Sequence, residues 1–163
     1  MTIYFYVPRD EWGWMSNFSL HGVELDGAWW PTVEHYFQAA KFVGTDPAHA
    51  AAIGRAAKAR DAARMGRDRG HPIRPDWEAV KEDVMRRAVR CKLETHPALL
   101  AKILATGDEE IVEASPIDFY WGAGKDGSGK NRLGQILMET RAALRAAPPL
   151  AAPPAKERRK KRG

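Results

Sequence analysis

The segment from Trp30 to Phe42 constrains the fold most strongly, because its apolar residues recur at the spacing of one face of an α-helix. Thr32, just before the first of them, is a suitable N-cap. One face of the resulting helix is apolar and consists of Val33, Tyr36, Phe37 and Ala40. The spacing predicts a short helix from about residue 33 to residue 42 that buries this face.

The opposite face of the same helix carries three polar side chains. Glu34, Gln38 and Lys41 are spaced by four and three residues and therefore lie together. Such a face is commonly a solvated surface on which the carboxylate and the amine form an ion pair. The neighbouring His35 and Trp30, in a segment unusually aromatic for a surface helix, favour a second interpretation, a binding or catalytic site.

A second stretch, Asp118 to Gly124, places an acidic residue before three aromatic rings and a glycine-rich loop. The loop is close to a phosphate-binding P-loop, but Asn131 stands where that motif has its magnesium-binding hydroxyl, so we do not expect a nucleoside triphosphatase. Its backbone amides, before a helix beginning near Lys130, could still hold a phosphate; the alternative is a flexible turn. Asp118 is either a cap or ion-pair partner or a functional carboxylate desolvated by the rings.

The net charge of +5 comes entirely from the C-terminus. Residues 156–163 hold six basic side chains against the single Glu157, so the rest of the chain is neutral. The Pro- and Ala-rich segment 146–154 should run extended and cannot join a helix. We therefore expect a catalytic domain over residues 1–146 and a linker with a disordered basic tail over residues 147–163. The tail either attracts nucleic acid, with DNA as a partner, or only aids solubility.

Several kinds of protein are disfavoured by what the chain lacks. The N-terminus has neither the basic region nor the apolar core of a signal peptide, and no apolar run approaches the roughly 18 residues of a membrane span. We expect a cytoplasmic protein with no membrane partner. Cys91 stands alone, and the histidines show no metal-ligand spacing. The sequence therefore predicts no internal disulfide, no metal site and no cofactor.

The 163 residues, 44% of them hydrophobic, fit one globular domain. Strands are expected at Ile3–Val7 and at 110–114, with a hairpin around Asp26-Gly27. Capping residues are expected at Asp46, before Pro47, and at Asp76. Further helices are predicted from residue 47, over 77–95, over 97–105 and from about 130. The predicted class is α+β: one compact, helix-dominated domain with a small N-terminal β-sheet or hairpin.

Taken together, these pieces resemble the NADAR family of YbiA-like N-glycosidases. The resemblance runs from Tyr4 to Arg145, and its specificity comes from the order of the motifs rather than from any single one. The matching motifs are Ser16-Asn17-Phe18, Trp30 to Phe42, Ala63 to Arg67, Asp76 to Lys81, Val84 to Ala88, Trp121-Gly122 and Gly129 to Gly134.

The resemblance implies a hydrolase that acts on the C–N bond between ribose and a nitrogenous heterocycle. One activity known in such proteins cleaves ribosylamino-pyrimidine phosphates, intermediates of riboflavin biosynthesis. Another removes ADP-ribose from guanine bases in DNA. A third interpretation is a module that binds ADP-ribose or a related nucleotide without catalysis. The first is the function we expect.

Spacing and resemblance together suggest a role for each candidate residue. Glu34 would stabilise oxocarbenium character on the ribose, and Asp118 would position water or a ribose hydroxyl. Lys41 would attack the anomeric carbon as an amine and form a Schiff base. The expected substrate-binding residues are Trp30 and Trp121, stacking on the base; Asn17, hydrogen-bonding it; Asn131 with the glycine loop, meeting phosphate; and Ser16, His35 and Gly122.

Overall fold

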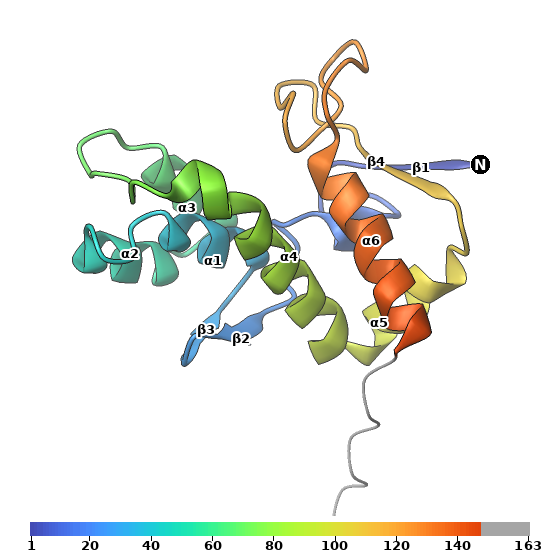
Figure 1. Ribbon diagram of the computed structural model, residues 1–163, viewed down its shortest axis with the longest axis horizontal. Helices are drawn as coiled ribbons and strands as arrows, with labels where there is room; N and C mark the ends of the chain where they lie inside the picture. The colour runs from blue at the N-terminus through green and yellow to red at the C-terminus, as the bar shows by residue number, and fades with distance from the viewer. Residues whose placement is uncertain (148–163) are drawn as a thin grey trace, which may run out of the picture.

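The computed structural model of the protein describes residues 1–147, so the predicted basic tail lies outside the described residues. Within them, far more residues lie in helices than in the four short strands, and the predicted α+β class is confirmed. The elements in chain order (Figure 1) are β1 (Thr2–Phe5), a 3-10 turn (Gly13–Met15), β2 (Val23–Leu25), β3 (Ala28–Trp30), α1 (Val33–Ala40), α2 (Pro47–Gly54), α3 (Ala59–Gly66), α4 (Trp77–Thr95), α5 (Pro97–Ala105), β4 (Glu110–Glu113) and α6 (Arg132–Ala146).

The four strands form two separate pairs. β1 runs parallel to β4, with Thr2 opposite Glu110 and Phe5 opposite Glu113, while β2 and β3 form an antiparallel hairpin. The hairpin turns at Asp26-Gly27, where both residues have the positive φ that a tight hairpin turn of this kind requires. The predicted hairpin is confirmed. The N-terminal strand, however, pairs with a segment more than a hundred residues away.

Of the three predicted N-cap residues, two accept a capping hydrogen bond from the first turn of their helix. The hydroxyl of Thr32 accepts the backbone N–H of His35 at 3.2 Å, and Asp46 accepts that of His49 at 3.0 Å. Asp76 occupies the N-cap position of α4 but makes no capping bond. Its two carboxylate oxygens instead accept from the guanidinium of Arg74, at 2.6 and 2.9 Å, so this predicted cap is wrong.

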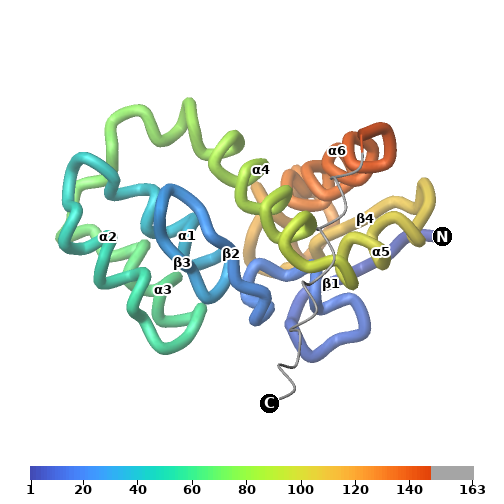
Figure 2. Tube along the Cα trace, turned by 90° about the horizontal axis from the view of Figure 1, so that it is seen from below, coloured from blue at the N-terminus to red at the C-terminus, as the bar shows by residue number. Residues whose placement is uncertain are grey.

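The elements gather on two sides of the long helix α4. Figures 1 and 2 show α1, α2 and α3 on one side, and α5, α6, β1 and β4 on the other. α1 packs against α2, α3 and α4, and α4 packs against α6. One large core links both sides, and a smaller cluster of Ala39, Phe42, Ile53 and Ala62 fills the space among α1, α2 and α3. No helix in residues 1–147 is long and apolar enough to cross a membrane.

Candidate active site

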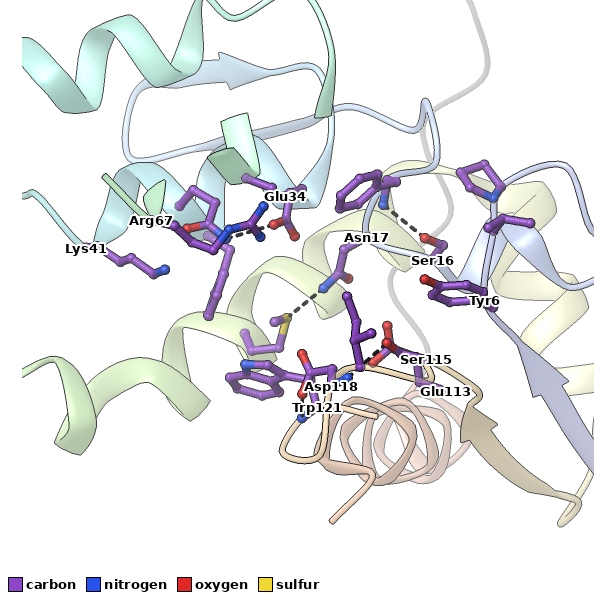
Figure 3. A pocket seen from close by; sticks show the side chains of 18 residues that line it. Tyr6, Ser16, Asn17, Glu34, Lys41, Arg67, Glu113, Ser115, Asp118 and Trp121 are labelled. Atoms are coloured by element: carbon purple, nitrogen blue, oxygen red, sulfur yellow. Dashed lines mark hydrogen bonds between the residues drawn. The ribbon is translucent and has the colours of Figure 1, made fainter. Parts of the chain in front are cut away.

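A cavity of about 430 Å³ opens between the two sides of the molecule (Figure 3). Its walls come from α1, the Ser16–Phe18 turn, the end of α3, the end of β4 and the loop that follows β4. The volume is within the usual range for small-molecule sites. Its ionisable and amide-bearing lining residues include Glu34, Gln38, Lys41, Arg67, Glu113 and Asp118; its aromatic ones are Tyr6, Phe18, Phe37 and Trp121.

Glu34 is buried in the first turn of α1, with 8% of its surface exposed. The side-chain amide of Gln38 donates to its Oε1 at 2.8 Å. Burial raises the pKa of Glu34, because the charged form loses hydration. The Gln38 hydrogen bond and the positive charges of Lys41 and Arg67 oppose this shift, while Asp118 adds to it. The polar face of α1 is therefore not the solvated surface that the sequence left open as an alternative.

Lys41 follows the last turn of α1 and points over aromatic rings. Its Nζ lies 5.8 Å from the ring centroid of Phe37 and 6.0 Å from that of Trp77. Burial lowers the pKa of this amine, and the nearby Arg67 lowers it further, whereas Glu34 raises it. Nζ lies over these rings rather than in an ion pair with Glu34, as far as the described residues show. A lysine in this setting can supply the neutral amine that nucleophilic attack requires.

Asp118 organises the loop on the far wall of the cavity. Its Oδ1 accepts the backbone N–H groups of Tyr120 at 2.9 Å and of Trp121 at 2.7 Å. This turn aims the Trp121 ring into the cavity, where it meets Phe37 edge-on at 5.4 Å between centroids. The predicted carboxylate and ring thus reach the cavity together, and the carboxylate helps to place the ring.

Ser16 and Asn17 reach the cavity on a turn that is tied to the helices around it. The backbone carbonyl of Asn17 accepts the N–H of Glu34 at 3.1 Å, so the turn and the start of α1 are held together. The carbonyl of Ser16 accepts from the buried Nζ of Lys92 at 2.9 Å. The side-chain amide of Asn17 lies 3.5 Å from Sδ of Met85, a weak acceptor, so it keeps donor capacity for a ligand.

Two predicted substrate contacts on or next to α1 lie outside the cavity. The indole N–H of Trp30 donates to the carbonyl of Leu25 at 3.0 Å. The His35 ring is 1% exposed, with Nδ1 at 2.7 Å from the Thr32 hydroxyl and Nε2 at 2.9 Å from the carbonyl of Ala56. Both side chains are occupied within the protein, so their predicted contacts with substrate are corrected to structural roles.

The predicted phosphate site at the glycine loop is also corrected. Asn131 uses its side chain internally: Oδ1 accepts the N–H of Glu113 and Nδ2 donates to the carbonyl of Ile111, both at 2.9 Å. The backbone N–H groups of residues 130–133 donate to carbonyls of residues 119–122, including that of Gly122. Neither Gly122 nor Asn131 lines the cavity. The N–H groups of residues 131–133 at the start of α6 are thus paired within the protein rather than left open to an anion.

Two charged lining residues were missed by the sequence analysis. Arg67, at the end of α3, belongs to a cluster of basic residues that is easily taken for a solvated surface. Glu113 is the last residue of β4 and lies in phase with the fully buried Ile111, two residues earlier. An acidic residue on the buried face of a strand is the signal that identifies it, because residues two apart share a face. Burial raises the pKa of Glu113 to about 8, and Asp118 and Glu34 add to the shift.

The described residues contain no group of three or more His, Cys, Asp or Glu side chains placed to hold a metal ion. What the cavity combines is a set of carboxyl groups, an amine of lowered pKa and an aromatic wall. These are the groups that chemistry at a glycosidic carbon uses. The fold and site thus define a small α+β domain equipped for work on a sugar derivative with a flat substituent.

The chain belongs to the NADAR domain family, which matches residues 4–145. It is 50% identical to "N-glycosidase YbiA" of Escherichia coli K12 over 142 residues, 87% of this chain and 88% of that protein. The NMR structure of E. coli YbiA superimposes with a TM-score of 0.82 at 49% identity, covering 89% of this chain and 85% of that one. The chain is also 44% identical to the maize "Riboflavin biosynthesis protein PYRR, chloroplastic", over 92% of its own length and 26% of that protein.

Proposed function

We propose that this protein is an N-glycosidase that hydrolyses the C–N bond between ribose and a nitrogenous heterocycle. The observation that supports this best is the convergence of Glu34, Lys41, Asp118 and Trp121 on one cavity. The N-glycosidase name of a relative that is 50% identical over 88% of its length points to the same reaction. The reaction consumes one water: its hydroxyl goes to the anomeric carbon and its hydrogen to the departing nitrogen.

The proposed substrate is a ribosylamino-pyrimidine phosphate, an intermediate of riboflavin biosynthesis. The name of the maize relative supports this class. The cavity suits it in size, and it has an aromatic wall for a flat ring and a cation, Arg67, for an anionic group. Trp121 stacks on the pyrimidine, and Asn17 hydrogen-bonds its edge.

In the proposed mechanism α1 supplies the groups that act on the sugar. Glu34, as a carboxylate, stabilises the positive charge that develops on the ribose, and Lys41 attacks the anomeric carbon as a neutral amine. The attack displaces the heterocycle, and ring opening gives an imine between Nζ and the ribose carbon. Water, positioned by Asp118, then hydrolyses the imine and releases ribose 5-phosphate. The lowered pKa of Lys41 favours its neutral amine form. Burial raises the pKa of Glu34, but the Gln38 hydrogen bond and the charge of Arg67 favour its carboxylate form.

The proposed catalytic unit is residues 1–146, with residues 147–163 as an appendage. Two observations support this boundary: α6 ends at Ala146, and the family match ends at residue 145. A second candidate function, removal of ADP-ribose from guanine bases in DNA, is favoured by the six basic side chains within residues 156–163. In that case, removing residues 147–163 weakens DNA binding and reduces its salt dependence while the domain still folds.

One assay separates these possibilities. The protein is incubated in parallel with a ribosylamino-pyrimidine phosphate and with ADP-ribosylated DNA, and the products are identified by mass spectrometry. We expect ribose 5-phosphate from the first substrate, and much slower release of ADP-ribose from the second. A preference for DNA supports the second function. Binding of ADP-ribose with no release from either substrate would make the protein a non-catalytic nucleotide binder and overturn the proposal.

A further inference from the structure

Glu113 occupies the wall of the cavity opposite α1. In Figure 3, Glu34, Lys41 and Arg67 lie along one side, and Glu113, Asp118 and Trp121 along the other. The backbone of Glu113 is held on both sides: its N–H donates to Asn131 Oδ1 and its carbonyl accepts the N–H of Ala123 at 2.8 Å. The side chain therefore projects from a rigid position at the end of β4.

The carboxyl group of Glu113 is short of hydrogen-bond partners. Its Oε2 is hidden from solvent and has no partner among residues 1–147. A buried polar atom without a partner is costly, so its persistence in a cavity calls for an explanation, and a ligand is the simplest. Asp118, its neighbour, differs: Oδ1 of Asp118 already accepts two backbone N–H groups.

The groups that face Glu113 favour its protonated form. The charged ones that influence it are Asp118 in the loop after β4 and Glu34 on α1, and both are acidic. Together with burial they raise the pKa of Glu113 to about 8. Glu34 is also buried, but its amide partner and two cations favour the carboxylate, and no such group acts on Glu113. Tyr6 lines the same cavity from the segment after β1.

We propose that Glu113 is a catalytic residue, the general acid that protonates the departing nitrogen of the heterocycle. This inference rests on the proposed N-glycosidase function and assigns a residue to the step in which the C–N bond breaks. An amine or amide nitrogen is a poor leaving group unless it receives a proton as the C–N bond breaks. Glu113 faces the scissile bond from the wall opposite Lys41, so nucleophile and acid act on opposite sides of the anomeric carbon.

The proton balance of the step is closed. Lys41 Nζ forms the new bond to the anomeric carbon, and the electron pair of the old C–N bond passes to the heterocycle nitrogen. That nitrogen takes the carboxyl proton of Glu113, leaving a carboxylate. The sugar ring then opens: the anomeric C–O bond breaks, one Nζ proton passes to the ring oxygen, and a protonated imine remains. When water hydrolyses this imine, its oxygen becomes the sugar carbonyl oxygen, Lys41 is released as a neutral amine and Glu113 takes the remaining proton, the switch from acid to base that microscopic reversibility allows.

The first test is the pH dependence of turnover for the wild-type protein, Glu113→Gln and Glu113→Asp. The wild type should lose activity as the pH rises through about 8, because the acid form of Glu113 is then lost. Glu113→Gln keeps the shape but has no proton to give, so turnover near pH 7 should fall by about 10²–10⁴-fold and the alkaline loss should disappear. Glu113→Asp should restore part of the rate and the alkaline loss.

Glu110→Gln is the matched control, because Glu110 lies on the same strand, is exposed and does not line the cavity. It should leave rate and pH profile unchanged. An unaltered alkaline limb in Glu113→Gln, or near-normal turnover, would overturn the assignment of Glu113 alone. If the wild type itself released no ribose, the proposed function would fail instead.

A second measurement does not depend on activity. Glutamate labelled with ¹³C at the side-chain carboxyl gives a resonance for Glu113 that can be assigned by its loss in Glu113→Gln. We expect this resonance to titrate near pH 8. Titration near the ordinary value of a glutamate, about 4.3, would overturn the proposal whatever the substrate proves to be.

Discussion

The side-chain amide of Gln38 donates to Oε1 of Glu34 at 2.8 Å, one turn away on α1, and holds that carboxyl group in the cavity. Gln38 lies close against Gly66 at the end of α3. A Cβ on Gly66 would lie 1.9 Å from Oε1 of Gln38 and 2.9 Å from its Cβ. The glycine is therefore what allows α3 to approach α1 closely enough to position the Glu34–Gln38 pair.

Gly66→Ala should lower both stability and turnover. The methyl group overlaps Gln38, which must move and release Glu34, and overpacking of this kind costs about 1–3 kcal/mol. That exceeds the helix-propensity gain of alanine over glycine, about 1 kcal/mol. Urea unfolding and steady-state kinetics check the two effects. In the background of Gln38→Ala, Gly66→Ala should cost less stability than it does alone; equal costs would show that the clash lies elsewhere.

Glu34→Gln keeps the shape of the side chain and removes its charge. If Glu34 stabilises the developing cation, turnover should fall by about 10²–10³-fold, the scale for losing one preorganised electrostatic partner. The melting temperature should not fall, because the variant no longer places an ionisable group in a buried site. Glu78→Gln is the control, since the Glu78 side chain is 81% exposed and forms a surface ion pair with Lys81. Retained activity in Glu34→Gln would remove Glu34 from the mechanism.

The Lys41 amine should be trapped during turnover. Borohydride reduces an imine to a stable secondary amine, so treatment of an active mixture should leave a sugar-derived mass on the peptide that contains Lys41. Lys41→Arg should abolish both adduct and turnover, because guanidinium keeps the charge but is not nucleophilic. Lys81→Arg should keep both, as Lys81 is engaged with Glu78 and the Tyr120 ring. An active Lys41→Arg without adduct would indicate direct attack by water.

Arg67 should bind the phosphate of the substrate. It lines the cavity, and it takes part in none of the ion pairs found within residues 1–147. A hydrogen bond to a charged group is worth about 1.5–3 kcal/mol, so Arg67→Gln should raise KM by about 10- to 100-fold with little change in kcat. The dephosphorylated substrate should show no such difference. Arg64→Gln, one turn earlier, is the control; an equal effect on both substrates would assign Arg67 another role.

Lys92 should make stability depend on pH. Burial lowers its pKa from 10.5 to about 7, and its Nζ donates to the carbonyl of Ser16. The unfolded chain therefore binds a proton between pH 7 and 10.5 that the folded chain does not, so folded stability rises with pH across this window. Relative to Lys92→Met, the free energy of unfolding should increase by up to about 5 kcal/mol from pH 7 to pH 10.5. Urea titrations check this; parallel curves for both proteins would show an unperturbed lysine.

The local features of this protein were readable from its sequence. The Thr32 cap, the apolar repeat after it and the spacing of Glu34, Gln38 and Lys41 all depend on contacts within about two helical turns. The Asp26-Gly27 turn likewise depends on the backbone preferences of two residues. The order of the motifs sufficed to recognise the family, because that order is a property of the chain itself.

Only the tertiary structure decided which of these groups share a cavity. Trp30 and Trp121 look equally suited to stack on a base, yet only Trp121 lines the cavity, because the indole of Trp30 is used to close the β2–β3 hairpin. The N–H groups of residues 129–131 donate to carbonyls of residues 119–123, which no local pattern indicates.

The pKa values of the cavity residues show most clearly what the sequence determines and what only the tertiary structure decides. The pKa values of Glu34, Lys41 and Glu113 are shifted first of all by burial, and the atoms that bury them come from segments far apart in the chain. β4 reaches the cavity because it pairs with β1, more than a hundred residues earlier. Sequence determines which ionisable groups exist, but desolvation depends on what surrounds them, and only the folded chain supplies those surroundings.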